Sequence, residues 1–450
     1  MRFIIALWIA KIVAVLINII DKKRGTNYSG ELAIKLCPNF IRKVKGIDLD
    51  KTIMVTGTNG KSTTTNLISY TINSSGKKVA TNKEGANMVG GVATTLIKNS
   101  SILGKFKKEF LILEIDERSL MAIHKNLPAK HLVITNLQKD QVQRNGDPNY
   151  IYSKFAKTIN KEMTIYLNNE EPRSKGLEDF AGNSIYYGVE KNSRTYEKND
   201  FYDVTLPCPK CNYPIKYLQY NLENIGKFEC TNCEHKSVEE PNVFITNVDF
   251  ENKVFIFNNK EYKITYNTPF YIYNYAATIA VAKNFGIEDE QIQNAFENFV
   301  NPLERREVLK YKNKEIKYLR MKQENPETLQ SALDTISLDK TPKAVLIGLY
   351  EIKDFYPFYT NTFYFFDCNF NKIAQTDVEK YIVFSKSVCY DAANRMVYAG
   401  AEKEKIIVLD KEDNIEEIIK HLDDIKTDNI YMITGMWPYK KIKAYLDIAG

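Results

Sequence analysis

The run from Val55 to Thr64 reads V-T-G-T-N-G-K-S-T-T, and it decides how the chain folds. It continues the short apolar run Ile53 to Val55, which predicts a buried strand, and it precedes a helical pattern from Asn66 to Tyr70. A strand, a glycine-rich turn and a helix start in this order form an anion cradle, because backbone N–H groups at the helix start face a bound phosphate. Lys61 is placed to reach the β and γ phosphates, and the Ser62 hydroxyl is placed to ligate Mg²⁺. We interpret the run as an ATP site.

The spacing of the two glycines differs from that of the common P-loop. Gly57 and Gly60 have two residues between them, whereas the common P-loop has four. The alternative is an ordinary glycine-rich turn, capped by a hydroxyl before a helix. Lys61 argues against that alternative, because a lysine directly before the hydroxyl run has no turn-forming role. The predicted nucleotide loop therefore comprises Gly57, Thr58, Asn59, Gly60, Lys61, Ser62 and Thr63.

A second apolar run, Phe110 to Glu117, ends in carboxylates. An acidic residue at the end of a buried strand beside a P-loop is where a Mg²⁺ ligand or a water-orienting group is needed, so Glu114 is a candidate for either role. The alternative is a solvated strand end. Short strands at Lys78 to Ala80 and His131 to Ile134 alternate with helical stretches. This alternation predicts an α/β fold with a parallel sheet, covered on both faces and binding ligands at its carboxyl edge.

Two C-x-x-C pairs mark an insertion. Cys208 and Cys211 are followed, after eighteen residues, by Cys230 and Cys233. Two such knuckles predict a zinc ribbon, and four thiolates close the coordination shell, so the Zn²⁺ is expected to be structural. A redox dithiol pair is the weaker alternative. The ribbon is expected at about residues 203–240, inside the ATP-binding domain, because strand patterns resume at Val243.

The first twenty residues are almost entirely apolar. Lys11 and Asn18 interrupt the run from Phe3 to Ile20, and they lie seven residues apart, on one helical face. Three interpretations are open: a helix packed on the body with one polar edge, an interfacial helix lying on a membrane, and a true membrane anchor. No small-residue cleavage motif follows, which argues against a secretory signal.

Composition limits the class of protein. A net charge of +6, from 62 basic and 56 acidic residues spread along 450 positions, gives little support for nucleic-acid binding. Seven cysteines without a secretory signal favour a reducing cytoplasm, and metal over disulfides. The chain is long enough for two or three domains.

The last third of the chain predicts a second α/β domain. Asn301 to Glu307 is interpreted as the linker into it. Apolar runs then predict strands at Ala344 to Gly348, Phe363 to Asp367, Lys380 to Phe384, Ile406 to Leu409 and Asn429 to Ile433. The expected domains are 1–45, a hydrophobic helix with its lead-in; 46–300, the ATP-binding domain; and 301–450, the smaller C-terminal domain.

Taken together, these motifs resemble the MurT family of the Mur ligase superfamily. The resemblance rests on the hydrophobic first helix, the nucleotide loop, the run E-G-A-N-M-V from Glu84, the strand end L-E-I-D-E, the run T-N-L-Q-K-D-Q from Thr135, the cysteine ribbon and the run A-N-R-M-V-Y-A-G from Ala393. Only 56 residues precede Gly57, which leaves no room for the UDP-sugar domain of other Mur ligases.

The resemblance implies an activity and a partner. MurT is the ligase-like subunit that works with a glutaminase subunit, GatD, to amidate the α-carboxylate of D-glutamate in lipid II, giving D-isoglutamine. It implies that ATP converts the carboxylate into an acyl phosphate, which ammonia from the partner attacks. The implied setting is peptidoglycan synthesis in the cytoplasm, at the inner face of the cell membrane, with peripheral membrane contact.

The resemblance also implies roles for individual residues. Lys61 and Ser62 would hold phosphate and Mg²⁺, and Glu114 would support the Mg²⁺. The cleft around nucleotide and acceptor would be lined by Asn82, Asn87 and Asn136. Asn274, at the start of the adenine-side helix, and Arg305, the first member of an interdomain R-x-E motif, would also bind the cofactor. Asp140 and Gln141 match a family D-Q pair, and Glu307 matches the second member of an R-x-E motif.

The C-terminal domain departs from the family pattern. The family has an aspartate in a D-x-S-W-x-W-D run, and the comparable run here is Asn361 to Asp367. Asp367 is retained, Asn361 stands where the first aspartate is expected, and Asp354 is a candidate replacement. Asp367 and Asp354 are therefore both candidate catalytic residues.

Two other functions remain open on this sequence. One is a stand-alone ligase that adds an amino acid to another carboxylate. The other is a non-catalytic ATP-binding scaffold, whose ribbon and last domain bind protein.

Overall fold

The structure is a computed structural model that describes residues 1–20, 27–82, 86–138, 147–197, 206–222, 224–300, 306–320, 326–349, 352–353, 360–361, 363–384, 388–411 and 415–449. The chain divides into two compact units, Met1–Gln138 with Asn145–Leu303, and Lys139–Arg144 with Glu304–Gly450.

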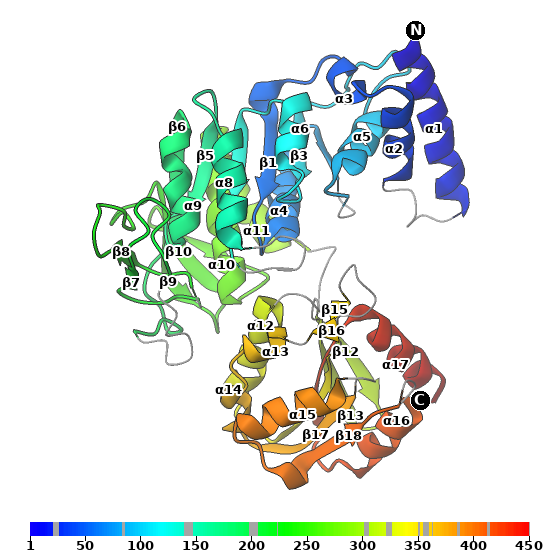
Figure 1. Ribbon diagram of the computed structural model, residues 1–450, viewed down its shortest axis with the longest axis vertical. Coiled ribbons are helices and arrows are strands. Elements are labelled where there is room, and N and C mark those ends of the chain that lie inside the picture. The colour runs from blue at the N-terminus through cyan, green and yellow to red at the C-terminus, as the bar shows by residue number, and fades with distance from the viewer. Residues whose placement is uncertain are drawn as a thin grey trace. The chain divides into compact units, whose positions relative to one another are not determined.

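A nine-stranded sheet is the framework of the first unit, in the order β11-β10-β9-β6-β5-β4-β1-β3-β2 (Figure 1). Neighbours from β9 to β2 are parallel, and β10 and β11 add an antiparallel edge. The strands are β1 (Thr52–Thr56), β2 (Val79–Thr81), β3 (Phe110–Glu114), β4 (His131–Ile134), β5 (Thr164–Asn168), β6 (Asn183–Val189), β9 (Val243–Asp249), β10 (Val254–Phe257) and β11 (Lys260–Lys263). The predicted parallel sheet is confirmed.

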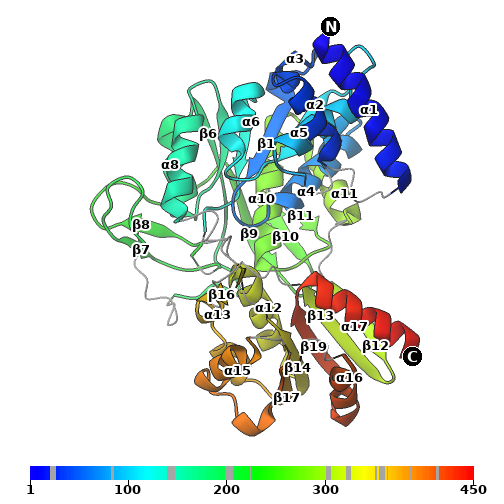
Figure 2. The same cartoon turned by 45° about the vertical axis from the view of Figure 1, so that its right-hand side comes forward.

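Helices cover both faces of this sheet (Figures 1 and 2). Because side chains alternate along a strand, Ile53 and Val55 of β1 enter one core and Met54 enters the other. The first core is covered by α4 (Lys61–Ser74), α10 (Pro269–Asn284) and α11 (Asp289–Asn298). The second is covered by α1 (Arg2–Ile20), α2 (Tyr28–Leu36), α3 (Phe40–Lys43), α5 (Val89–Lys98), α6 (Leu120–Asn126) and α8 (Pro148–Thr158). The remaining short helices are η2 (Leu49–Lys51), α9 (Pro172–Gly176) and η3 (Leu177–Phe180).

The hydrophobic first helix packs on the body of the unit. Ala6, Leu7 and Ala10 of α1 are fully buried in the second core. Lys11 points the same way and caps the end of α5. No helix in the described part of the chain is long and apolar enough to cross a membrane.

The cysteine insertion forms a small separate sheet. Strands β7 (Ile215–Tyr217) and β8 (Phe228–Cys230) pair antiparallel (Figure 1). Cys208 and Cys211 precede β7, Cys230 ends β8, and Cys233 follows it. Its buried core consists of Cys208, Ile215 and Phe228. A core this small provides little stability of its own.

The second unit has a six-stranded sheet in the order β12-β13-β19-β14-β17-β18, parallel except for the β12–β13 hairpin. Its strands are β12 (Arg306–Tyr311), β13 (Lys314–Arg320), β14 (Lys343–Gly348), β17 (Val378–Phe384), β18 (Ile406–Leu409) and β19 (Asn429–Thr434). Its helices are α12 (Pro326–Leu338), α13 (Phe363–Phe366), α14 (Asn371–Ala374), α15 (Cys389–Tyr398), η4 (Lys403–Lys405), α16 (Ile415–Asp424) and α17 (Met436–Ala449). Strands β15 (Ile352–Lys353) and β16 (Thr360–Asn361) form a short pair of their own.

One predicted strand of this unit is wrong. The aromatic run from Phe363 to Asp367 contains α13 and no strand. A short run that is apolar at every position has no periodicity to separate strand from helix. Phe365 is fully buried in the core of the unit, which one turn of helix achieves as well as a strand does.

Candidate nucleotide and metal sites

The nucleotide loop joins β1 to α4 through two glycines in left-handed backbone conformations. Gly57 has a φ of 126°, and a Cβ there would lie 2.3 Å from Thr135 Oγ1. Gly60 has a φ of 82°, and a Cβ there would lie 2.4 Å from Asn274 Oδ1. Both positions therefore require glycine, for conformation and for space. The loop leads directly into the N-terminus of α4, where unpaired N–H groups favour an anion.

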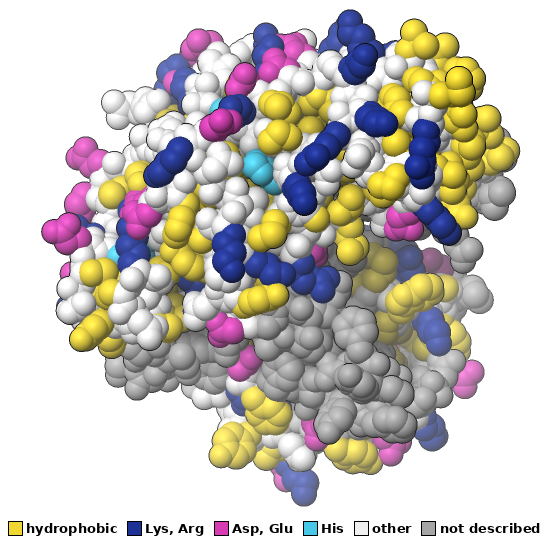
Figure 3. All heavy atoms as spheres, turned by 45° about the horizontal axis from the view of Figure 1, so that its top comes forward, with side chains coloured by type: hydrophobic (Ala, Val, Ile, Leu, Met, Phe, Trp, Pro, Cys, Tyr) yellow, Lys and Arg dark blue, Asp and Glu magenta, His cyan; other side chains and the backbone are white. Residues whose placement is uncertain are grey.

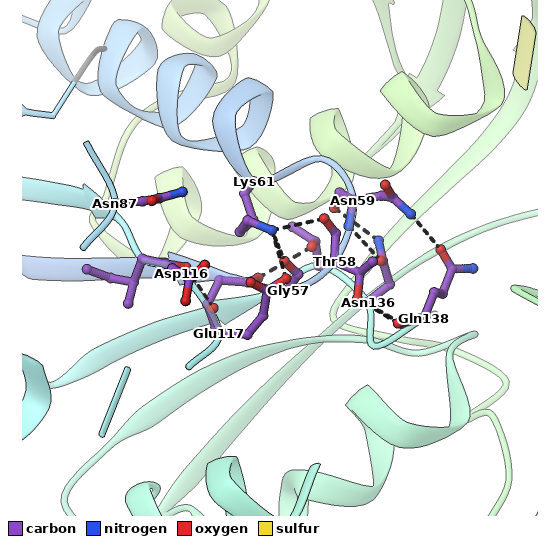
Figure 4. A network of polar contacts seen from close by, with 12 residues as sticks. Gly57, Thr58, Asn59, Lys61, Asn87, Asp116, Glu117, Asn136 and Gln138 are labelled. Carbon is purple, nitrogen blue, oxygen red and sulfur yellow. Dashed lines mark hydrogen bonds and ion pairs between the residues drawn. The ribbon is translucent and has the colours of Figure 1, made fainter. Parts of the chain in front are cut away.

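Amide side chains from the loop after β4 hold the nucleotide loop in place (Figure 4). Asn136 accepts a hydrogen bond from the Asn59 backbone N–H at 3.0 Å and donates one to the Asn59 carbonyl at 3.1 Å. The Gln138 side chain accepts from Asn59 Nδ2 at 3.1 Å, and its backbone N–H donates to Thr58 Oγ1 at 2.9 Å. All four side chains are buried, so the loop is held before any ligand arrives.

Lys61, the first residue of α4, is folded back into the loop (Figure 4). Its Nζ donates to the carbonyls of Gly57 and Thr58, the latter at 2.9 Å. Nζ also forms an ion pair with Glu117 Oε1 at 2.8 Å, and both side chains are more than nine-tenths buried. The ammonium group is thus fixed within the loop that would surround a phosphate chain.

Glu117 lies three residues beyond the end of β3 and is the buried partner of that lysine. Burial raises the pKa of Glu117, and the adjacent Lys61 charge and hydrogen bond oppose the rise. A carboxylate held this way balances the lysine charge while no phosphate is bound. Breaking a buried pair of this kind leaves an uncompensated charge unless phosphate replaces the carboxylate.

Glu114 ends β3 and is 5% exposed. Its Oε1 accepts a hydrogen bond from Asn87 Nδ2 at 2.9 Å. Asn82 binds the backbone of the same residue instead, accepting from the Glu114 N–H and donating to its carbonyl, each at 2.8 Å. Asn87 therefore orients the carboxylate and Asn82 fixes the strand end, so the amide of Asn82 is committed to backbone.

The first turn of α4 meets α10. Ser62 and Thr63 are partly buried there. Thr64 donates through Oγ1 to Asn274 Oδ1 at 3.1 Å, which brings Asn274 against Gly60 as well. The Ser62 hydroxyl and the Glu114 carboxylate are hard oxygen donors of the kind Mg²⁺ prefers, so the donor set fits that ion.

The four predicted cysteines come together. The sulfur atoms of Cys208, Cys211, Cys230 and Cys233 all lie within 4.8 Å of one another. Cys208 Sγ is 3.7 Å from Cys233 Sγ, and Cys211 Sγ is 3.4 Å from Cys230 Sγ. A zinc tetrahedron with bonds of about 2.3 Å has sulfur edges of about 3.8 Å, so the cluster fits a metal. The backbone N–H groups of Asn232 and Cys233 both donate to Cys230 Sγ at 3.4 Å.

Comparison with known families gives two matches along the chain. The Mur ligase middle domain matches residues 55–234, and the MurT ligase C-terminal domain matches residues 323–436. A Staphylococcus aureus (strain COL) protein, the MurT subunit of lipid II isoglutaminyl synthase (glutamine-hydrolyzing), is 28% identical over 80% of both chains. The MurT subunit of Streptococcus pneumoniae (strain ATCC BAA-255 / R6) is 26% identical over 94% of this chain and 93% of its own.

The chain is similar to MurT subunits over 80% or more of its length. With its Mur ligase middle domain and its MurT ligase C-terminal domain, it is an ATP-dependent ligase of the Mur ligase type. A solved structure, the pseudomurein peptide ligase type C from Methanothermus fervidus, has the same fold. It gives a TM-score of 0.66 at 21% identity, over 92% of this chain and 81% of its own.

In the MurT-type C-terminal unit, Asp367 directly follows α13 and is partly buried. Arg395 of α15 fixes the backbone on both sides of it, donating to the carbonyls of Phe365 at 3.2 Å and Cys368 at 2.6 Å. Gln330 accepts a further hydrogen bond from the Asn369 N–H at 2.6 Å. The segment that carries Asp367 is thus held from two helices.

Several predicted site residues lie outside the described residues of this MurT relative. They are Arg305, Asp140, Gln141 and Asp354. Asn361 belongs to β16 and Glu307 to β12, but their side chains are not among those described.

Sequence reasoning missed three residues that matter for the geometry of the candidate sites in the two units. Glu117 stands out in the sequence only as part of the strand end, although a carboxylate three residues past Glu114 falls near the loop lysine. Gln138 follows Asn136 by two residues, a spacing that brings both to one side of an extended segment. Arg395 stands within the family run from Ala393, and only its contacts show that it anchors the Asp367 segment.

Proposed function

We propose that the chain is the ATP-using subunit of a lipid II isoglutaminyl synthase. Its reaction would convert the α-carboxylate of D-glutamate in the lipid II stem peptide to the amide of D-isoglutamine. One observation supports this most strongly: a nucleotide loop held by Asn136, with Lys61 inside it, in a chain that also matches the MurT C-terminal domain.

The chemistry needs an activated carboxylate, because a free carboxylate is a poor acyl donor. The carboxylate oxygen attacks the γ-phosphorus of ATP, a P–O bond forms, the bond to the β-phosphate oxygen breaks, and ADP leaves. Ammonia then attacks the acyl carbon, the C–N bond forms, inorganic phosphate leaves, and the nitrogen loses a proton. Bound Mg²⁺ would neutralise phosphate charge in the first step.

The residues of the chain have separate tasks in this proposal. Lys61 binds the transferred phosphate, exchanging Glu117 for a phosphate oxygen. Ser62 and Glu114 hold Mg²⁺, with Asn87 orienting the carboxylate. Asn274 and Arg305 line the nucleotide side. Asp367 assists the ammonia step, with Arg395 as its positioning residue.

The ammonia is proposed to come from a glutaminase subunit of the GatD type. The support is the name of the relatives, which describes them as subunits of a glutamine-hydrolyzing synthase. The four-cysteine cluster would hold a structural Zn²⁺ in this subunit. The lipid-linked substrate would bring the cytoplasmic complex to the inner face of the membrane.

The test measures two products with purified protein. Phosphate release from ATP and amidated lipid II are followed with glutamine or with ammonium, with and without a GatD-type subunit. Amidation from glutamine only with the subunit, and from ammonium without it, is the expected result. A Lys61→Ala variant is expected to give neither product.

Two results would overturn the proposal. ATP turnover and coupling of an amino acid without the glutaminase subunit would identify a stand-alone ligase. ATP binding without turnover under every condition would identify a scaffold.

A further inference from the structure

Helix α1 directs Lys11 toward the protein and a strip of apolar residues toward solvent. Lys11 Nζ donates to the carbonyls of Ile97 at 2.6 Å and Ser100 at 2.7 Å, at the C-terminal end of α5. A cation at that end of a helix satisfies free carbonyls and complements the helix dipole. The one lysine in the middle of the hydrophobic run is thereby removed from the outer face.

The outer face of α1 is a continuous apolar strip. Its side chains are between 37% and 61% exposed, and their spacing of three and four residues places them on one side of the helix. They are Ile5, Trp8, Ile9, Ile12, Val15 and Leu16. We call this set the α1 face.

A neighbouring loop extends the α1 face. Ile102 and Leu103 are 66% and 71% exposed. Trp8 donates through Nε1 to the Ile102 carbonyl at 2.8 Å, which holds the loop against the helix. Figure 3 shows hydrophobic side chains gathered at the edge of the molecule, with Lys and Arg side chains beside them. Exposed apolar patches of this kind mark a binding surface.

The elements that carry this face and the segments next to them are rich in basic residues. Residues 1–17, 27–47 and 86–108 contain ten Lys and Arg and a single acidic residue, Glu31. The whole chain has a net charge of only +6, so the rest of it is net negative. Positive charge is thus concentrated around the apolar strip.

We propose that the α1 face docks on the surface of a bilayer that contains anionic lipid, with the helix lying in the plane of the interface. An apolar helix face flanked by Lys and Arg is the combination that interfacial helices use. Trp8 adds an indole, which favours the boundary between acyl chains and headgroups. Insertion across the bilayer is opposed, because Ala6, Leu7 and Ala10 are buried against the body and Lys11 is bonded to it.

The role of this docking surface rests on the proposed function, because a lipid-linked substrate is reached only at a membrane. Its test is independent of the reaction. The full-length protein is mixed with vesicles of phosphatidylcholine alone, or with about 30% phosphatidylglycerol, in about 0.15 M salt and without lipid II or ATP. Flotation separates bound from free protein.

The expected result is binding to the anionic vesicles and much weaker binding to the neutral ones. A double variant, Ile12→Glu with Val15→Glu, is expected to bind at least about tenfold more weakly. The control is Val397→Glu, which places one glutamate at an exposed valine of α15 and should bind as the wild type does. Circular dichroism and a melting curve check that each variant is folded.

A second measurement leaves the face unchanged. The chain has two tryptophans, so a Trp437→Phe variant reports Trp8 alone. Its emission is expected to shift to shorter wavelength when anionic vesicles are added. Absence of wild-type binding to anionic vesicles, or equal binding by the double variant, would overturn the proposal. A dimer in solution that the double variant separates would instead identify the face as a contact between copies. Failure of amidation alone would leave the docking surface standing.

Discussion

The nucleotide loop and the four-cysteine ribbon are both irregular segments, yet different forces hold them. The nucleotide loop is fixed by buried hydrogen bonds from Asn136 and Gln138 and by the Lys61–Glu117 pair. The ribbon has a core of three buried residues and four convergent thiols. The protein therefore assembles the loop by itself, whereas we expect the ribbon to need a bound metal for its stability. Single substitutions are therefore expected to weaken the nucleotide loop in steps, whereas loss of the metal is expected to unfold the ribbon completely.

Removal of the ribbon metal should have the largest effect. Structural Zn²⁺ in zinc-finger peptides contributes roughly 10–16 kcal/mol, far more than the ribbon core can replace. A strong chelator, or the variant Cys211→Ser, is expected to unfold residues 206–222 and 224–240 and to expose them to protease. Elemental analysis should give one zinc per chain before treatment and none after it.

Cys37→Ala is the matched control, because it removes a buried thiol far along the chain from the cluster. It should keep its zinc and its protease resistance. A ribbon that stays folded after the chelator has removed its metal would show that the three-residue core is sufficient to hold the ribbon. The contrast between the two regions would then disappear.

Loss of Lys61 should come second. Lys61→Ala removes the charge that meets the phosphates, and we expect phosphate release to fall by about 10³-fold or more. The measurement is phosphate release from ATP with acceptor present. Lys77→Ala, which removes a half-exposed lysine just after α4, is the control and should retain activity. A loss of less than tenfold in Lys61→Ala would mean that the loop does not carry the phosphoryl transfer.

The features that the sequence predicts correctly are those set by residues close together in the chain. The nucleotide loop and the cysteine spacing are local patterns, and the parallel sheet follows from strand and helix alternation, so all three were predictable. The pairing of Lys61 with Glu117 depends on how β3 lies beside β1, which no local pattern states. Asn82 remains a predicted residue of the ligand cleft. The hydrogen bonds of its amide to the backbone of Glu114 depend on tertiary structure, so the sequence does not predict them.

The two regions are connected through neighbouring acidic residues. Glu170 accepts hydrogen bonds from Asn221 of the ribbon insertion and from Tyr273 of α10. Glu171 accepts from the Leu137 N–H at 3.0 Å, next to the Asn136 that holds the nucleotide loop. A change at Glu170 is therefore expected to destabilise both the ribbon and the domain that contains the nucleotide loop.

Stability is expected to depend on pH through Glu170, the third effect in size. Burial raises the pKa of Glu170 to about 7, although hydrogen bonds from Tyr273, Val189 and Asn221 oppose the rise. The native state then binds more protons than the unfolded state between the ordinary glutamate pKa of 4.5 and about 7. The extra proton stabilises the native state. This stabilisation is fully present below the pKa of Glu170 in the unfolded state and is lost as pH rises through its pKa in the native state. The free energy of unfolding then falls by about 3 kcal/mol.

Urea unfolding at about pH 5 and about pH 8 measures this effect. The wild type should lose more stability between the two than Glu170→Gln, which has no proton to release. Glu197→Gln changes an exposed side chain and should keep the wild-type difference. Equal pH dependence in Glu170→Gln and wild type would show that Glu170 does not release its proton in this range.

Loss of the hydrogen bonds between Asn136 and the nucleotide loop should have the smallest effect. Asn136→Ala removes two hydrogen bonds to the Asn59 backbone, each worth about 0.5–1.5 kcal/mol, so ATP affinity is expected to fall by roughly tenfold. Calorimetric titration with ATP and Mg²⁺ measures this, and Asn126→Ala, which removes an exposed amide bonded to Ala122, is the control. The loop should remain formed, because Gln138 still holds Thr58 and Asn59. Complete loss of ATP binding would mean that the loop depends on Asn136 alone, as the ribbon is expected to depend on its metal. The contrast between the two regions would then disappear.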